Sequence, residues 1–231
     1  MSAPLSREEW LKIRAASQEA VLAAGIPVND LLLGYQKRGV DLLETTAVLV
    51  VEKSRRIGFT WGLASYAVLR ASRMRAARGY DVMYISYSQE MTREFIDACA
   101  MWARAFAIAA GETGELMFDD VDPENPSETR QIKAFRIQFA SGFEILALSS
   151  APRSLRGKQG CVIVDEAAFV DSLAELLKAA LAFLMWGGQV VVVSTHNGTT
   201  NAFNELCQDI LKGRKPYAHM RVDFDQALQE G

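Results

Sequence analysis

The sequence is short of cysteine, of histidine and of any long apolar run. Only 3 cysteines occur among 231 residues. Because Cys99, Cys161 and Cys207 are far apart, their spacing predicts neither a zinc cluster nor a disulfide framework. No apolar segment approaches the length of a membrane span, and the segment from Met1 to Trp10 is too polar for a signal peptide. We therefore expect a cytoplasmic protein with no membrane partner.

Acidic residues are missing between Lys53 and Arg78, where seven cations occur. The formal net charge of the whole chain is −3, so any contact with nucleic acid must come from a local patch of this kind. The second half of the run, from Arg70 to Arg78, has two explanations. Cations are favoured at the C-terminal end of a helix, and they are equally suited to a surface that faces DNA. The sequence leaves both open.

Apolar runs alternate with helical patterns along most of the chain. Strands are predicted at 47–51, 82–86, 132–139, 143–149, 161–164, 190–194 and 219–224, with 132–139 and 143–149 forming a hairpin. Helices are predicted at 6–25, 35–44, 60–77, 89–110, 172–186 and 201–212. The composition of segment 111–129 predicts a long polar loop. Continuous Val/Ile/Leu strands between helices predict an α/β fold, with a mostly parallel sheet covered by helices on both faces.

The loop that follows the first strand combines cations with a Gly-x-Thr sequence at a helix start. It comprises Lys53, Ser54, Arg55, Arg56, Ile57, Gly58, Phe59 and Thr60. In such a loop, backbone N–H groups and the helix N-terminus bind phosphate, and a threonine hydroxyl suits Mg²⁺. A Walker A loop has lysine where this chain has Phe59. We expect Phe59 to turn into the core and Lys53, Arg55 or Arg56 to supply the missing charge, with Lys53 the best placed.

Two further strands end in polar groups. The run Cys161–Val164 is followed by Asp165 and Glu166, a Walker B form in which the first acid holds Mg²⁺ and the second polarises the attacking water. The strand ending near 194 leads into Ser194, Thr195, His196 and Asn197. These residues are candidates for sensing the γ-phosphate. Because all of these groups leave the carboxyl ends of strands, they are expected to converge on one crevice.

In these three motifs the sequence resembles the ATPase domain of tailed-phage terminase large subunits, the Mu-like branch in particular. The resemblance covers the chain from about Leu31 to its end. It implies a P-loop NTPase fold of the RecA-like (ASCE) class, with ATP and Mg²⁺ as ligands. In some members of the family the Walker A lysine stands at the start of the loop, which is the position of Lys53.

The resemblance also implies roles for three more residues. Gln36 matches the glutamine that terminases and helicases use to recognise adenine. Arg56 matches a loop arginine that acts near the phosphates, either in catalysis or as a sensor. Arg156 resembles the arginine of an Arg-Gly pair before Walker B and is a candidate for contact with a neighbouring subunit's nucleotide.

The family implies a motor that drives double-stranded DNA into a capsid. Its expected partners are DNA, a small terminase subunit, the portal protein and further copies of the chain in a ring, in the cytoplasm of a bacterial host. We expect residues 1–231 to form one ATPase domain, with N-terminal helices to about residue 45 and the P-loop core from residue 46. The nuclease domain of full-length large terminases is expected to be absent.

Two other functions remain open from the sequence. A helicase-like DNA-dependent ATPase has similar motifs, but it needs a second lobe for which 231 residues leave no room. A nucleotide-binding module that has lost hydrolysis is favoured by Phe59 and opposed by Glu166.

Overall fold

The fold is known from a computed structural model that describes residues 32–106, 110–121 and 129–230. The predicted helix over residues 6–25 lies outside these ranges. The described strands are β1 (Val48–Lys53), β2 (Val82–Ser86), β3 (Ala110–Val121), β4 (Thr129–Phe139), β5 (Glu144–Ser149), β6 (Cys161–Asp165), β7 (Gln189–Ser194) and β8 (Ala218–Val222). The described helices are α2 (Gly34–Thr45), α3 (Phe59–Ala71), α4 (Gln89–Ala105), α5 (Leu173–Leu181), α6 (Ala202–Leu211) and α7 (Phe224–Gln229).

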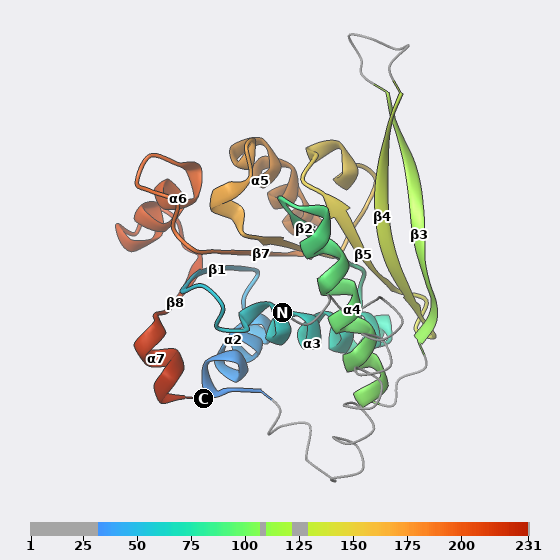
Figure 1. The fold of residues 1–231 in the computed structure, drawn as a ribbon, viewed down its shortest axis with the longest axis horizontal. Coiled ribbons are helices and arrows are strands. Elements are labelled where there is room, and N and C mark those ends of the chain that lie inside the picture. The colour runs from blue at the N-terminus through green and yellow to red at the C-terminus, as the bar shows by residue number, and fades with distance from the viewer. Residues whose placement is uncertain (1–31, 107–109, 122–128, 231) are drawn as a thin grey trace, which may run out of the picture.

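The strands of the described residues form one sheet in the order β3-β4-β5-β2-β6-β7-β1-β8. From β5 to β8 every neighbouring pair is parallel, while β3, β4 and β5 pair antiparallel. The β3–β4 hairpin extends well beyond the layers of helices (Figure 1). This arrangement confirms the predicted α/β fold with a mostly parallel sheet.

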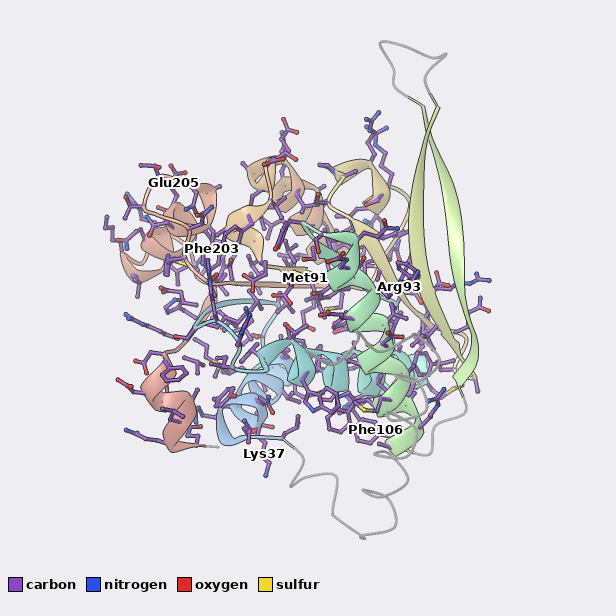
Figure 2. The ribbon with its side chains drawn as sticks, in the orientation of Figure 1. Lys37, Met91, Arg93, Phe106, Phe203 and Glu205 are labelled. Atoms are coloured by element: carbon purple, nitrogen blue, oxygen red, sulfur yellow. The ribbon has the colours of Figure 1, made fainter. Side chains whose placement is uncertain are left out.

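Helices cover both faces of the sheet, with α2, α3 and α4 on one face and α5 and α6 on the other (Figure 1). Each face has its own buried apolar cluster, because successive side chains of a strand point to opposite faces. In β1, Leu49 and Val51 belong to the first cluster, and Val48 and Val50 to the second. Figure 2 shows side chains filling the space between helices and sheet, including the fully buried Phe203 of α6. The central strands are thus buried on both sides, as their continuous apolar runs predict.

The prediction of a polar loop over segment 111–129 is wrong for its first half. Residues 110–121 form β3, whose backbone pairs with β4 in a register that places Asp119 opposite Gln131. The strand lies at the end of the sheet and is held by backbone pairing. A strand in such a position needs little apolar sequence, so composition alone does not reveal it. Residues 122–128 lie outside the described ranges.

Three helices are shorter than predicted. Helix α3 ends at Ala71, and a separate 3-10 turn, η2 (Arg75–Ala77), follows it. Helix α4 ends at Ala105, and the predicted helix 172–186 divides into α5 and the 3-10 segment η5 (Ala182–Trp186). Two further 3-10 segments, η3 (Pro152–Leu155) and η4 (Ala167–Phe169), flank β6. Within the described ranges, no helix has both the length and the apolar character that a bilayer span requires.

Candidate functional site

The loop between β1 and α3 turns sharply at two residues with positive φ. Arg56 has φ 58° and Gly58 has φ 72°, and Gly58 is the N-cap of α3. The loop is tied at both ends, because the Ser54 amide donates to Val222 O (2.9 Å) and Gln36 Nε2 donates to Gly58 O (2.8 Å). The Ser54 amide is therefore engaged by β8. The N-terminus of α3 is the part of the loop suited to an anion.

Phe59 points away from the loop into the core, as predicted. Its side chain is 3% exposed, and its ring stacks on Tyr35 with centroids 6.5 Å apart. Gly39 in α2 provides the space, since a Cβ there would lie 2.8 Å from Phe59 Cζ. Tyr35 in turn donates its hydroxyl proton to the carbonyl of Ile57 in the loop. An aromatic residue at this position thus anchors the loop to α2.

Lys53 meets the second Walker B acid. Its Nζ lies 2.5 Å from Glu166 Oε1, and the two side chains are only 6% and 16% exposed. Lys53 is the last residue of β1, and Glu166 follows β6 directly. Convergence of the loop and the Walker B strand at the carboxyl edge of the sheet is therefore confirmed for these two residues.

Asp165 is the most enclosed acid of the site, with no exposed surface. Its Oδ2 accepts from Thr60 Oγ1 (2.7 Å) and Tyr84 Oη (2.9 Å), and its Oδ1 accepts from the Glu166 amide (2.9 Å). Burial raises the pKa of this carboxyl above its usual value, while Lys53 and the Thr60 hydrogen bond oppose the rise. A buried carboxylate beside a threonine hydroxyl offers the oxygen ligands that Mg²⁺ takes.

Glu166 is held in a constrained position. Its backbone adopts the left-handed conformation with φ 50°, which is uncommon for a residue with a side chain. Its Oε2 accepts from the Thr195 amide and Thr195 Oγ1, both at 3.3 Å, with Ser194 Oγ at 3.5 Å. One carboxylate oxygen is thus paired with Lys53, and the other with the last residue of β7 and the residue that follows it.

The four residues predicted as sensors separate into two groups. Ser194 and Thr195 contact Glu166 through the bonds to its Oε2. The His196 side chain turns elsewhere and pairs its Nε2 with Glu52 Oε2, and Asn197 Nδ2 reaches the Ala168 carbonyl at 3.5 Å. Contact with the acid that would activate water is therefore limited to the first two.

Gln36 is 4% exposed, and both ends of its amide are engaged. Its Oε1 accepts from the Leu33 amide (2.9 Å), while its Nε2 donates to Gly58 O. The geometry makes Gln36 a brace between α2 and the loop, and its adenine contact stays a prediction. Arg55, Arg56 and Arg156 are exposed, and no described ion pair joins them to the residues above.

Part of the basic run has a structural partner. Arg70 is 3% exposed, and Arg70 Nη2 lies 3.7 Å from Glu44 Oε2. Arg73 donates to both Glu44 oxygens at 3.0 Å. Arg75 and Arg78 are exposed. Arg70 therefore lies in the last turn of α3, as the helix-end explanation requires, and both Arg70 and Arg73 are paired with Glu44. A DNA-facing role for Arg75 and Arg78 stays a prediction.

Sequence reasoning missed Tyr84, Tyr35 and Glu52. Tyr84 lies within an apolar strand, where a tyrosine is expected as a packing residue, and its hydroxyl reaches Asp165 only through the pairing of β2 with β6. Glu52 had a signal in the sequence. A carboxylate directly after four apolar strand residues needs a partner if it is buried, and Glu52 is 9% exposed.

The chain matches the family model described as terminase large subunit, T4likevirus-type, N-terminal, over residues 50–228. It is 52% identical over 203 residues to the Mu-like prophage FluMu protein gp28 of Haemophilus influenzae, covering 88% of this chain and 38% of that protein. It is 44% identical over 208 residues to the probable terminase, large subunit gp28, of Escherichia phage Mu, covering 89% and 36%. The chain thus spans less than two fifths of these relatives.

Among solved structures, the large terminase of a thermophilic bacteriophage in complex with ADP has a similar fold. The TM-score is 0.59 at 14% identity, over 86% of this chain and 47% of the other. The large terminase ATPase domain of a Thermus phage is also similar, with a TM-score of 0.53 at 18% identity, over 80% of this chain and 79% of the other. At these identities the likeness concerns the fold, and membership rests on the family match. The chain belongs to the terminase large subunit family, and it corresponds to the N-terminal, ATPase region of the Mu-like branch.

Proposed function

We propose that this domain hydrolyses ATP with Mg²⁺ and that its turnover drives double-stranded DNA into a phage capsid. The observation that carries the proposal is one connected network at the carboxyl edge of the sheet. It joins the Walker A loop to the Walker B acids through Lys53–Glu166 and Thr60–Asp165. These groups come from sequence positions more than 100 residues apart, and each has the chemistry that phosphoryl transfer needs.

Lys53 takes the role of the displaced Walker A lysine in this proposal. An ammonium has three protons to donate, and the ion pair with Glu166 uses one of them. The others would be available to β- and γ-phosphate oxygens bound at the N-terminus of α3. Arg56 is exposed on the same loop and suits the charge that develops on the γ-phosphate.

Glu166 orients and polarises the attacking water. Its Oε1 is paired with Lys53, and its Oε2 is within hydrogen-bond distance of Ser194 and Thr195. The contact with Thr195 supports a sensor role, because any movement of the loop after β7 alters the position of the carboxylate. Hydrolysis and the shape of this loop are thereby coupled.

Thr60 and Asp165 would hold Mg²⁺. The fit rests on their hard oxygen atoms, 2.7 Å apart, and on the full burial of Asp165. When bound, the ion would neutralise charge on the β- and γ-phosphates. Tyr84 orients the carboxylate of Asp165 from behind, through its hydroxyl proton.

The proposed partners are double-stranded DNA, a small terminase subunit, the portal protein and further copies of the chain in a ring, in the bacterial cytoplasm. Support comes from the family and from the two Mu-type relatives. Arg156 is exposed, as a contact across subunits requires. Arg75 and Arg78 are the cations proposed to face DNA.

A module that binds nucleotide without hydrolysing it is the alternative, and Phe59 is the residue that favours it in the sequence. Phe59 packs in the core, so its presence does not depend on whether the site hydrolyses ATP. The intact Lys53–Glu166 pair favours the enzyme.

The test is steady-state ATP hydrolysis by the whole chain, with and without double-stranded DNA, for the wild type, Lys53→Ala and Glu166→Gln. We expect measurable turnover in the wild type and a loss of at least about 100-fold in each variant. Glu166→Gln should still bind ATP. Wild-type ATP binding with a negligible rate that neither substitution changes, even with DNA present, would contradict the proposal.

A further inference from the structure

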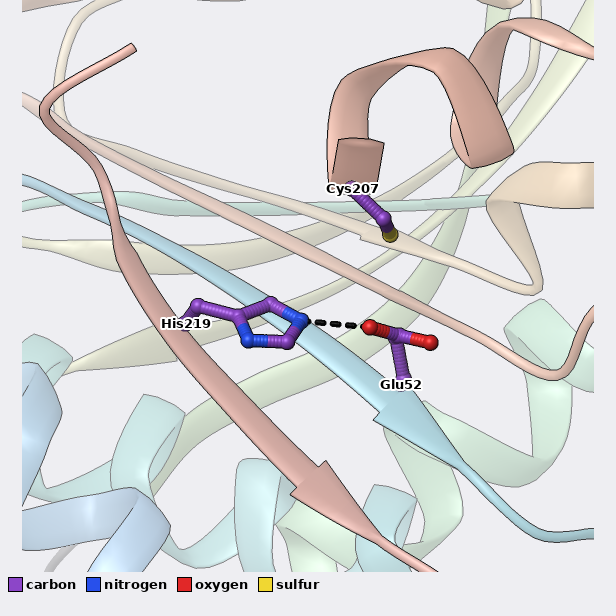
Figure 3. A group of neighbouring side chains, drawn as sticks. All are labelled: Glu52, Cys207 and His219. Atoms are coloured by element: carbon purple, nitrogen blue, oxygen red, sulfur yellow. Dashed lines mark hydrogen bonds and ion pairs between the residues drawn. The ribbon is translucent and has the colours of Figure 1, made fainter. Parts of the chain in front are cut away.

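Both histidines of the chain converge on one buried acid outside the ATP site. The sequence contains 2 histidines, and the Nε2 atoms of His196 and His219 each contact a different oxygen of Glu52. His219 lies in β8, and His196 lies in the loop after β7. Cys207 approaches from α6, and Figure 3 shows Glu52, Cys207 and His219 pointing toward a common centre from three elements.

The distances suit a single bound cation. Nε2 of His219 lies 2.6 Å from Glu52 Oε1. The ligand atoms of Glu52, Cys207 and His219 all lie within 4.8 Å of one another. Ligands of a tetrahedral zinc ion are roughly 3.3–3.8 Å apart, given bonds of about 2.0–2.3 Å. The 2.6 Å contact between His219 and Glu52 is shorter than this separation, so it would have to open when the cation enters.

Glu52 is a buried carboxylate among groups that ligate metals. It is 9% exposed, and the ion pairs described for it are with His196 and His219. Its neighbour Lys53 is paired with Glu166 instead. A carboxylate, an imidazole and a thiol that meet in this way are ligand types of divalent cations.

We propose that Glu52, Cys207 and His219 form a binding site for a zinc-type divalent cation, with the fourth position open to a solvent ligand. A set of one imidazole, one carboxylate and one thiolate favours zinc and its late first-row neighbours. Mg²⁺ and Ca²⁺ prefer oxygen ligands throughout, so the site is chemically distinct from the one at Thr60 and Asp165.

Binding has a defined proton balance. Burial, with the nearby charge of Glu52, raises the pKa of the Cys207 thiol to about 12. The thiol is therefore protonated at neutral pH, and it must release this proton when its sulfur binds the cation. His219 Nε2 faces Glu52 Oε1 in the metal-free protein, so the proton that this hydrogen bond uses must also leave to solvent, or move to Nδ1, before Nε2 binds the cation.

A cation here would connect three elements beside the proposed ATP site. Glu52 in β1 immediately precedes Lys53, and His219 and Cys207 add β8 and α6. The cation would therefore fix the strand that carries Lys53 against β8 and α6. The loop after β7 would be joined to this centre only through the pairing of His196 with Glu52.

The test is a titration of the whole chain, freed of metal, with Co²⁺ as a spectroscopic probe for zinc. We expect one equivalent to bind with the visible bands of tetrahedral Co²⁺ and a near-ultraviolet band from a thiolate ligand. Zn²⁺ should displace it. Cys207→Ser should lose the thiolate band, and Glu52→Gln and His219→Asn should weaken binding by at least about tenfold.

Two matched variants separate this site from others. Cys99→Ser changes another buried cysteine, which donates to Ala64 O, and it should leave the spectrum unchanged. Asp165→Asn alters the proposed Mg²⁺ site and should also leave it unchanged. If a ligand variant does not fold, thermal unfolding of the wild type decides alone, because one equivalent of Zn²⁺ must then raise its Tm.

Absence of a thiolate band in the folded wild type, or its persistence in Cys207→Ser, would overturn the proposal. So would a wild-type Tm that Zn²⁺ leaves unchanged. Any of these results would mean that the cluster binds no cation and that Glu52 is held only by its hydrogen bonds with His196 and His219.

Discussion

At the scale of single residues, the site depends on which groups share each carboxylate. Asp165 and Glu166 are adjacent, yet Asp165 is fully buried and bonded to two hydroxyls, whereas Glu166 is paired with an ammonium. These environments suit the different chemistry that we propose for the two acids, in which Asp165 binds a cation and Glu166 acts on water.

Tyr84→Phe tests the support behind Asp165. The substitution removes one hydroxyl and keeps the ring, which stacks on Phe95 with centroids 3.7 Å apart. We expect little loss of stability but a rise of about tenfold in the Mg²⁺ concentration required for half-maximal ATP turnover. Phe95→Leu is the control, because it alters the stack and leaves the hydroxyl. An unchanged Mg²⁺ dependence in Tyr84→Phe would remove Tyr84 from the site.

Phe59→Lys tests whether the lysine of a standard Walker A loop can be restored. Phe59 is 3% exposed in the apolar core, so the new ammonium would lose its hydration there. We expect a stability loss of about 3–5 kcal/mol and no recovery of turnover when the change is combined with Lys53→Ala. Recovered ATP hydrolysis in that double variant would show that position 59 faces the phosphates. Chemical denaturation and turnover of the same samples are the measurements.

At the scale of elements, the loop 54–58 is positioned by α2. Gln36 and Tyr35 bond the carbonyls of Gly58 and Ile57, and Phe59 packs against Tyr35. None of these contacts requires the nucleotide. The N-terminus of α3 is therefore set in place by the protein itself, which lowers the entropy cost of binding phosphate.

Gly39→Ala should shift the loop 54–58 without replacing any residue of the proposed ATP site. The added Cβ would lie 2.8 Å from Phe59 Cζ, so the ring must move. We expect a destabilisation of about 1–3 kcal/mol together with weaker ATP binding. Gly142→Ala is a control for loss of glycine, since nothing lies near its Cβ position, although its φ of 85° adds local strain. Normal ATP affinity in folded Gly39→Ala would mean that α2 does not set the loop. Isothermal titration calorimetry provides the comparison.

Much of this arrangement follows from the sequence, because apolar runs and strand-end polar groups are local signals. Such signals predict the parallel strands, the burial of the Phe59 side chain and the convergence of Lys53 and Glu166 at one edge of the sheet. The strand 110–121 was missed since backbone pairing at a sheet end leaves little trace in composition. Tyr84 and the Glu52 cluster were missed because their contacts depend on which strands become neighbours, and sequence order does not give that.

At the scale of the whole molecule, charged groups divide between two ends of the sheet. The proposed ATP site lies at the carboxyl ends of the strands. Glu44 and Arg70 lie near the opposite ends, since Glu44 is in the helix that precedes β1 and Arg70 is in the last turn of the helix that follows it. The proposed DNA contact at Arg75 and Arg78 belongs to that second region.

Glu44→Gln tests the structural part of the basic run. Burial raises the pKa of Glu44. The hydrogen bond from Arg73 and the charges of Arg70 and Arg73 lower this pKa by more, so its net value lies below the usual one. A lowered folded pKa stabilises the protein above the unfolded value of 4.5 and loses this effect as pH falls through the folded value. We expect Glu44→Gln to cost about 1–2 kcal/mol at pH 7, after allowance for its partial exposure.

Thermal unfolding at a series of pH values checks this. The difference in Tm between wild type and Glu44→Gln should shrink below about pH 4. A difference in Tm that stays constant with pH would mean that the loss of stability comes from packing and not from the charge of Glu44.

Because Arg73 is paired with Glu44, charge reversal at Arg73 is a poor probe of DNA contact. Charge reversal at Arg75 and Arg78 should instead lower DNA-stimulated turnover and its salt dependence without a loss of stability.

The affinity for ATP relative to AMP in Lys53→Ala tests the central claim most directly, because only ATP has the β- and γ-phosphates. The double variant Lys53→Ala with Glu166→Gln removes the complication that Glu166 would otherwise be left uncompensated. We predict that both variants lose at least about tenfold in ATP affinity with AMP binding nearly unchanged, and that Arg56→Ala loses less. Unchanged ATP affinity in the double variant, with a large loss in Arg56→Ala, would contradict the assignment of Lys53.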